Sequence, residues 1–91
     1  MATGTATLDF TSSGSQLAQV NVTGQAGILS GSNIEAFLQA NDSTADNTAF
    51  AHQVVPLRVR CGNVVAGTGF TIYGVSDWSL FKTYLVRWVW V

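Results

Sequence analysis

The residues best suited to catalysis lie in one polar stretch, "NDSTADNTAFAH", at residues 41–52. Its His52 is the only histidine of the chain, and Asp42, Ser43 and Asp46 precede it in the same stretch. A histidine with a nearby carboxylate and hydroxyl is the residue set of general-base catalysis. A catalytic triad is defined by three-dimensional geometry, however, and a stretch of this polarity brings such residues together through composition alone. We therefore expect that the protein is not an enzyme.

Three other chemical motifs are incomplete. Cys61 falls in an alternating row of apolar residues, which favours a buried, inert thiol over a nucleophile. The segment "GNVVAGTG" has the glycine spacing of a phosphate-binding loop, but Thr68 stands where the essential lysine would be. Asp42 and Asp46 could ligate Ca²⁺, yet the stretch has neither the EF-hand spacing nor its bidentate glutamate, which favours a solvated or helix-capping loop. We expect no metal and no cofactor.

Aromatic side chains provide the main alternative to a purely structural protein. An exposed aromatic ring with amide groups around it suits the recognition of a sugar ring. Trp78 lies between Asp77 and Ser79 in what reads as a connection, so it is the ring most expected to be exposed. The candidate ligand contacts are Tyr73, Trp78 and His52, together with the rest of the 41–52 loop.

The composition argues against several classes of partner. Charged residues make up 10% of the chain, against about 25% in an average soluble domain, and the net charge is −1. Four basic residues cannot supply the dense positive surface that nucleic acid requires. No apolar run approaches the roughly 20 residues that span a bilayer. The start "MATGTATLDF" has no secretory-signal pattern and Cys61 is single, so we expect synthesis and folding in the cytoplasm.

Apolar and polar residues alternate with a period of two along most of the chain, which predicts β-strands. Turn-forming stretches such as "TSSGS" separate the alternating runs. The inward rows predicted by this alternation are Ala6, Leu8 and Phe10; Ala18, Val20 and Val22; and Val55, Leu57, Val59 and Cys61. We expect one domain over residues 1–91, an all-β antiparallel sandwich, jelly-roll-like or a small barrel, of six to seven short strands.

The middle of the chain has less regular patterns. "GQAGILSGS" reads as a glycine-punctuated connection that carries Ile28 and Leu29 inward. Residues 33–40 fit a strand, which we prefer because the neighbouring elements are strands, and they also fit a helix with capping-box spacing. One helical turn is expected near residues 44–51.

Proline and glycine mark the next strand and its end. Pro56 cannot donate a ladder hydrogen bond, so the strand that contains it is expected to begin at a sheet edge or to be interrupted there. Gly62–Asn63 is a turn signal. Gly67 and Gly69 allow a bulge or a tight bend before the next strand.

Several phrases of the sequence, taken together, resemble one group of proteins. They are "VNVTGQAGI" at residues 20–28, "IEAFL" at 34–38, "STADNTAFAH" at 43–52 and "NVVAGTGFTIYG" at 63–74, followed by the closing "VRWVWV". This set is similar to small virion proteins and fibre-associated domains of tailed bacteriophages. The resemblance implies a β-sandwich structural module of the virion, in a tail fibre, tail tip or head-decoration setting. It also implies repetition by symmetry, with a homotrimer preferred.

The last strand, "YLVRWVWV" at residues 84–91, is apolar on both faces. One row contains Tyr84, Val86, Trp88 and Trp90, and the other contains Leu85, Arg87, Val89 and Val91. A sandwich core covers one face only, so we expect one row to be exposed in a single protomer and buried in an oligomer. The expected interface residues are Leu85, Val89 and Val91, with Trp88 and Trp90 either across the core or in a second contact. Arg87 then needs a carboxylate such as Glu35 or Asp9.

The expected function is therefore a phage virion structural protein, a decoration, cement or fibre-associated subunit. It would act by symmetric self-association and by attachment to other virion proteins. The alternative is a receptor-binding tip that recognises a host-surface glycan. The sequence leaves open whether the N-terminal "MATGTA" is free or adds a strand to a neighbouring subunit.

Overall fold

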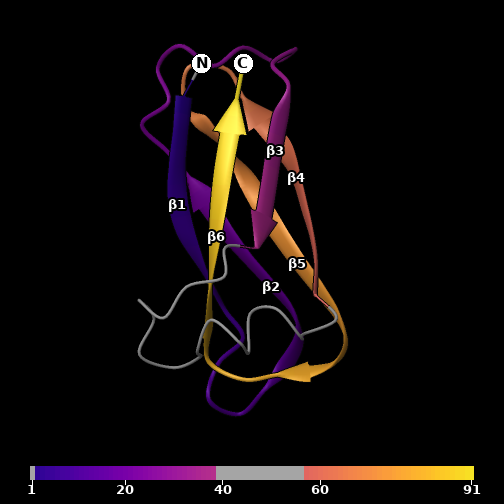
Figure 1. Cartoon of the computed structure of the whole chain (residues 1–91). Coiled ribbons are helices and arrows are strands. Elements are labelled where there is room, and N and C mark those ends of the chain that lie inside the picture. The colour runs from indigo at the N-terminus through magenta and orange to yellow at the C-terminus, as the bar shows by residue number, and fades with distance from the viewer. Residues whose placement is uncertain (1, 39–56) are drawn as a thin grey trace.

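We describe the chain from a computed structural model for residues 2–38 and 57–91, and six β-strands make up the regular structure of these two ranges (Figure 1). The strands are β1 (Ala2–Asp9), β2 (Ser15–Val22), β3 (Ile34–Leu38), β4 (Leu57–Val65), β5 (Gly69–Leu80) and β6 (Thr83–Trp90). No helix occurs in these two ranges, and so none there could cross a membrane. The all-β fold predicted from the alternation is confirmed.

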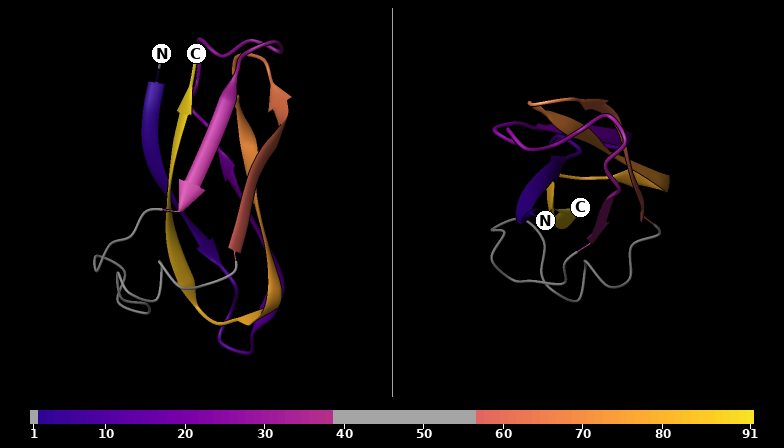
Figure 2. Two further views of the ribbon diagram at one scale, coloured as in Figure 1. Left: turned by 45° about the vertical axis from the view of Figure 1, so that its right-hand side comes forward. Right: turned by 90° about the horizontal axis from the view of Figure 1, so that it is seen from above.

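The strands form two antiparallel sheets of three strands each. Sheet A has the order β1-β6-β3, and sheet B has the order β2-β5-β4. Figure 2 shows the two sheets as separate layers, consistent with a small β-sandwich. The two central strands are consecutive in the sequence, and the chain passes from one sheet to the other at Phe81 and Lys82. Lys82 has a positive φ of 65° at this corner, and its backbone bonds to Phe10 and Thr11 hold it against the end of β1.

The inward rows of both sheets fill one core. Its buried hydrophobic side chains are Leu8, Phe10, Val22, Ile28, Phe70, Ile72, Leu80, Tyr84, Val86 and Trp88. Two aromatic pairs meet edge to face in the core, Phe10 with Tyr84 at 5.9 Å and Phe70 with Trp88 at 5.5 Å between ring centroids, and the second pair joins β5 of sheet B to β6 of sheet A. Such contacts add to the stabilisation from burial alone. The predicted inward rows of β1 and β2 belong to this core or pack against it.

The structure decides the conformation of two segments for which the sequence left alternatives open. Residues 34–38 form strand β3 with the predicted alternation, so the helix reading of 33–40 is excluded for this part. The N-terminal segment is an ordered strand of its own sheet, because β1 pairs with β6 from Ala2↔Trp90 to Asp9↔Thr83. The helical turn predicted near residues 44–51 lies outside the described residues.

Two local predictions are wrong. Gly62–Asn63 does not form the turn, because β4 continues to Val65 with a register shift between Gly62 and Val65, and Asn63 takes a positive φ of 53°. The turn lies at residues 66–68, where the N–H of Thr68 donates to the carbonyl of Val65 at 3.0 Å. The tight bend that Gly67 and Gly69 were predicted to allow is therefore confirmed, whereas Gly62–Asn63 lies at an irregularity within the strand.

Leu29 is the second error. It is 68% exposed, whereas Ile28 is fully buried as predicted. A tight turn explains the difference, since the N–H of Leu29 donates to Ser32 Oγ and its carbonyl accepts from the N–H of Ser32, each at 3.0 Å. These bonds fix a backbone in which only one of two adjacent apolar side chains can point inward.

Candidate functional site: the outer faces of the two sheets

Strand pairing places three cross-strand rows on the outer face of sheet A. The rows are Thr3–Val89–Glu35, Thr5–Arg87–Phe37 and Thr7–Leu85, in each case with the β6 residue between β1 and β3. Directly opposed side chains in an antiparallel pair lie on the same face and in contact range. The outer face therefore combines small threonines on β1 with larger apolar side chains on β6 and β3.

The apolar side chains of this face are partly accessible. Leu85 and Val89 are half-buried, while Phe37 is 47% and Val91 64% exposed. Val89 and Val91 line a depression of about 380 Å³ together with Asn33, Ile34 and Glu35. The row Leu85, Val89 and Val91 that was predicted as an interface thus lies on the accessible side of the protomer.

The two tryptophans of β6 lie on the opposite side of the strand. Trp88 is only 6% exposed and belongs to the core, so it is not available to a partner while the protomer is folded. Trp90 is half-buried, and its indole N–H donates to Gln25 Oε1 at 2.9 Å. These two residues were predicted to lie either across the core or in a second contact, and the structure places Trp88 in the core.

Charged groups of both signs lie on the outer face of sheet A. Arg87 is exposed at its centre, and Phe37 is its direct neighbour on β3. Glu35 is exposed opposite Val89, which makes it the diagonal neighbour of Arg87. Asp9 lies at the far end of β1, where its Oδ1 accepts a hydrogen bond from the backbone N–H of Thr11 at 2.8 Å.

The outer face of sheet B has a different character. Its cross-strand rows are Leu17–Val75–Arg58, Gln19–Tyr73–Arg60 and Asn21–Thr71–Gly62. Thr71 is only 3% exposed, because its hydroxyl donates to Asn21 Oδ1 at 2.8 Å and accepts from Asn63 Nδ2 at 3.5 Å. Amide groups, one phenol ring and two guanidinium groups therefore share this face.

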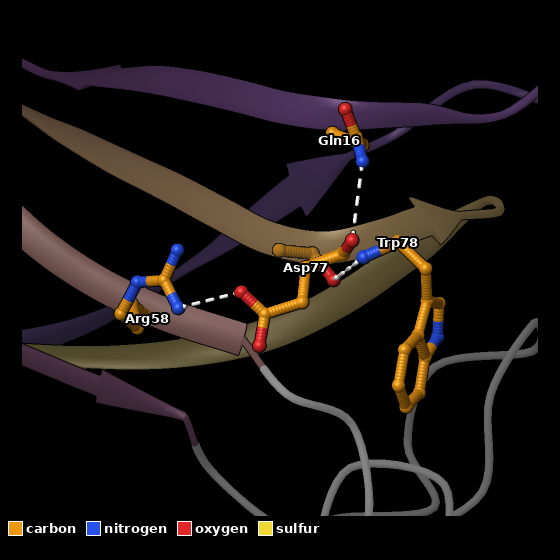
Figure 3. A network of polar contacts seen from close by, with 5 residues as sticks. Gln16, Arg58, Asp77 and Trp78 are labelled. Atoms are coloured by element: carbon orange, nitrogen blue, oxygen red, sulfur yellow. Dashed lines mark hydrogen bonds and ion pairs between the residues drawn. The ribbon is translucent and has the colours of Figure 1, made fainter.

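The end of β5 presents an exposed tryptophan. β5 pairs with β2 in two registers, Leu17↔Val75 and Ser15↔Leu80, so the intervening residues of β5 bulge out of the ladder. Three polar contacts hold the bulge (Figure 3). Arg58 Nη1 pairs with Asp77 Oδ1 at 2.8 Å, Gln16 Nε2 donates to the Asp77 carbonyl at 3.2 Å, and the N–H of Trp78 donates to Ser76 Oγ at 3.3 Å. The Trp78 side chain is 58% exposed and points away from Arg58 and Gln16.

The predicted ligand contacts are not gathered in one place. Tyr73 lines a depression of about 190 Å³ with Leu17, Ala18, Gln19, Gly74 and Val75, and Trp78 is not part of its wall. Trp78 lies in strand β5 instead of the predicted connection, although it is exposed as expected. His52 and the rest of the 41–52 loop lie outside the described residues.

The one cysteine is poorly suited to chemistry. Burial raises the pKa of the Cys61 thiol, and the negative charge of Glu35 raises it further. Burial also raises the pKa of the Tyr84 phenol. Among residues 2–38 and 57–91, no three His, Cys, Asp or Glu side chains group together as a metal site would require. A protonated thiol is a weak nucleophile, and Cys61 is half-buried against the core.

Comparison of the chain with protein-family models, curated proteins and solved structures found no match. The candidate sites therefore stand on the geometry of this chain. Three of their members, Phe37, Gln19 and Arg60, are not among the site residues predicted from the sequence. Side-chain alternation could have indicated that they lie on the outer faces, because each of them falls on the polar side of its strand.

Proposed function

We propose that the protein is a structural subunit that associates with further copies of itself through the outer face of sheet A. One observation carries the proposal: β6 is the central strand of its sheet, and Leu85 and Val89 lie on the side of β6 that faces away from the core. A strand in a two-layer sandwich normally alternates apolar and polar residues. An apolar outer row at the centre of a sheet is typical of a surface that is covered in an assembly.

A second copy of this chain fits the face better than a strongly charged partner would. The chain has a net charge of −1, so copies repel one another only weakly. Glu35 and Arg87 put opposite charges on the same face, which lets one copy present an acid where its neighbour presents a base. Together with the resemblance described above, this supports a phage decoration, cement or fibre-associated subunit, with a homotrimer as the preferred state.

The test is the oligomeric state of matched variants. Native mass spectrometry and sedimentation at micromolar concentration should give a homo-oligomer for the wild type and a folded monomer for Val89→Asp. Leu17→Asp is the control, because Leu17 is an exposed leucine on the outer face of the other sheet. A wild-type protein that stays monomeric and does not bind virion components, or an oligomer that Leu17→Asp disrupts and Val89→Asp does not, would refute the proposal.

A second candidate function, glycan recognition by a receptor-binding tip, is favoured by Trp78. Its ring is 58% exposed, and the backbone beneath it is fixed by the contacts of Asp77 and Ser76. A large exposed ring on a held backbone loses little freedom when it stacks on a sugar. Glycan binding that is lost in Trp78→Ala and kept in Val89→Asp would support this function, and the reverse pattern would contradict it.

A further inference from the structure

The central row of sheet B combines three groups of complementary chemistry. Gln19, Tyr73 and Arg60 are direct cross-strand neighbours on the outer face, with Tyr73 on the central strand β5 between Gln19 on β2 and Arg60 on β4. The ring leans toward a glycine, since Cε2 of Tyr73 lies 3.6 Å from the Cβ position of Gly62.

The two arginines of β4 differ in their surroundings. The guanidinium of Arg58 is paired with Asp77 at 2.8 Å. Arg60, two residues along the same strand and also exposed, has no ion pair or side-chain hydrogen bond within the described ranges. One uncompensated positive charge therefore lies beside the Tyr73 ring.

The depression beside Tyr73 sets the size of a ligand. Its volume is about 190 Å³. This is below the roughly 300 Å³ at which sites for drug-sized ligands begin, so the depression has room for one sugar ring of a longer saccharide. Its wall is formed by residues of β2 and β5, among them the apolar Leu17 and Val75 and the polar Gln19, while Arg60 on β4 lies on the other side of Tyr73 and outside the wall. A pyranose ring presents the same mixture, with apolar C–H groups on its face and hydroxyls at its edge.

We propose that the outer face of sheet B binds a saccharide that carries a carboxylate, with Tyr73 against the sugar ring and Arg60 on the carboxylate. The proposal rests on the second candidate function, for which it names the ligand class and places the contact at Tyr73. A guanidinium binds a carboxylate through two parallel hydrogen bonds, which gives both charge and orientation. The face lies on the other side of the sandwich from the proposed assembly surface, so both can be used at once.

The test is an NMR titration of the ¹⁵N-labelled protein with trigalacturonic acid. Shift changes should centre on Gln19, Arg60 and Tyr73, and Arg60→Gln should weaken binding about ten-fold or more through loss of the charged hydrogen bonds. Arg60→Lys should retain part of the affinity. Arg58→Gln is the matched control, since it removes a charge from the same strand and face that Asp77 already neutralises, and it should leave binding nearly unchanged.

Two further probes separate recognition of the charge from recognition of the ring. The methyl ester of the same trisaccharide has the rings without the charge, and triglutamate has the charge without the rings. Each should therefore bind more weakly than trigalacturonic acid. The proposal would be overturned if Arg58→Gln and Arg60→Gln weakened binding equally, or if either probe bound as well as trigalacturonic acid. It would also be overturned if millimolar trigalacturonic acid caused no shift changes. If saccharides bind in a way that needs Trp78 and not Arg60, glycan recognition stands and the acidic site at Tyr73 fails. If no saccharide binds at all, both fail.

Discussion

Gly4 on β1 and Trp88 on β6 are register partners, and the indole ring of Trp88 occupies the space that a side chain at position 4 would need. A Cβ on Gly4 would lie 2.5 Å from Cζ2 of the ring. Trp88 cannot easily withdraw, because its other contacts include the edge-to-face pair with Phe70. The glycine at position 4 therefore makes room for a core tryptophan.

Gly4→Ala should destabilise the fold despite the better strand propensity of alanine. Overpacking of this kind costs about 1–3 kcal/mol of the free energy of unfolding. Gly31→Ala is the control, because no atom lies within 4 Å of its Cβ position and its φ is not positive, so that change should be neutral or slightly stabilising. Urea unfolding of both variants decides the matter; equal stability of the two would contradict the packing described for Trp88.

The hydrogen bond between Trp90 and Gln25 should contribute to the stability of the fold. Gln25→Ala removes the acceptor for the indole N–H and should lower the free energy of unfolding by about 1 kcal/mol. Gln25→Glu keeps an acceptor oxygen and should lose less. Urea unfolding followed by tryptophan fluorescence measures both changes, and an identical loss in the two variants would show that the acceptor is not what matters.

The ion pair of Arg58 and Asp77 should contribute little stability. The side chains of its members are 53% and 60% exposed, and exposed pairs are worth about 0–1 kcal/mol. A double-mutant cycle with Arg58→Gln and Asp77→Asn should therefore give a small coupling energy that decreases further at high salt. A coupling that is large and independent of salt would mean that the pair is shielded from solvent, contrary to its exposure in the protomer.

Much of the fold could be predicted because side-chain alternation is a local property. The rows of Leu8 and Val22, and the choice of strand for 34–38, follow from it directly. The order of strands in each sheet does not, because it depends on which edges meet in three dimensions. The bulge that exposes Asp77 and Trp78 was also missed, since it arises from a mismatch between β2 and β5 that neither strand reveals alone.

The candidate sites, like the fold, could be predicted only in part. Alternation was enough to put Leu85 and Val89 in one row and the tryptophans in the other. It could not determine which row faces the core, because both are apolar, and packing of Trp88 against Gly4 and Phe70 decides this. The row of Gln19, Tyr73 and Arg60 joins three strands, so it becomes visible only once their registers are known.

Alkaline pH should destabilise the protein through Cys61 and Tyr84. Burial raises the pKa of the thiol above its ordinary value of 9.0, with a further contribution from Glu35, and burial raises the pKa of the phenol above 10.0. The folded state thus binds these protons more tightly than the unfolded state does. Their contribution to stability is complete below the ordinary pKa and is lost as the pH rises through the ordinary value toward the raised one.

The free energy of unfolding measured between pH 8 and pH 11 should therefore fall first through the thiol and then through the phenol. Cys61→Ala should remove the earlier part of the decline and Tyr84→Phe the later part, whatever each does to stability at neutral pH. Glu35→Gln should lower the pKa of the thiol, and the rate of reaction of Cys61 with a disulfide reagent should then rise at a lower pH than in the wild type. A decline that is unchanged in Cys61→Ala, with an unshifted reaction profile in Glu35→Gln, would mean that the thiol is solvated and distant from the carboxylate.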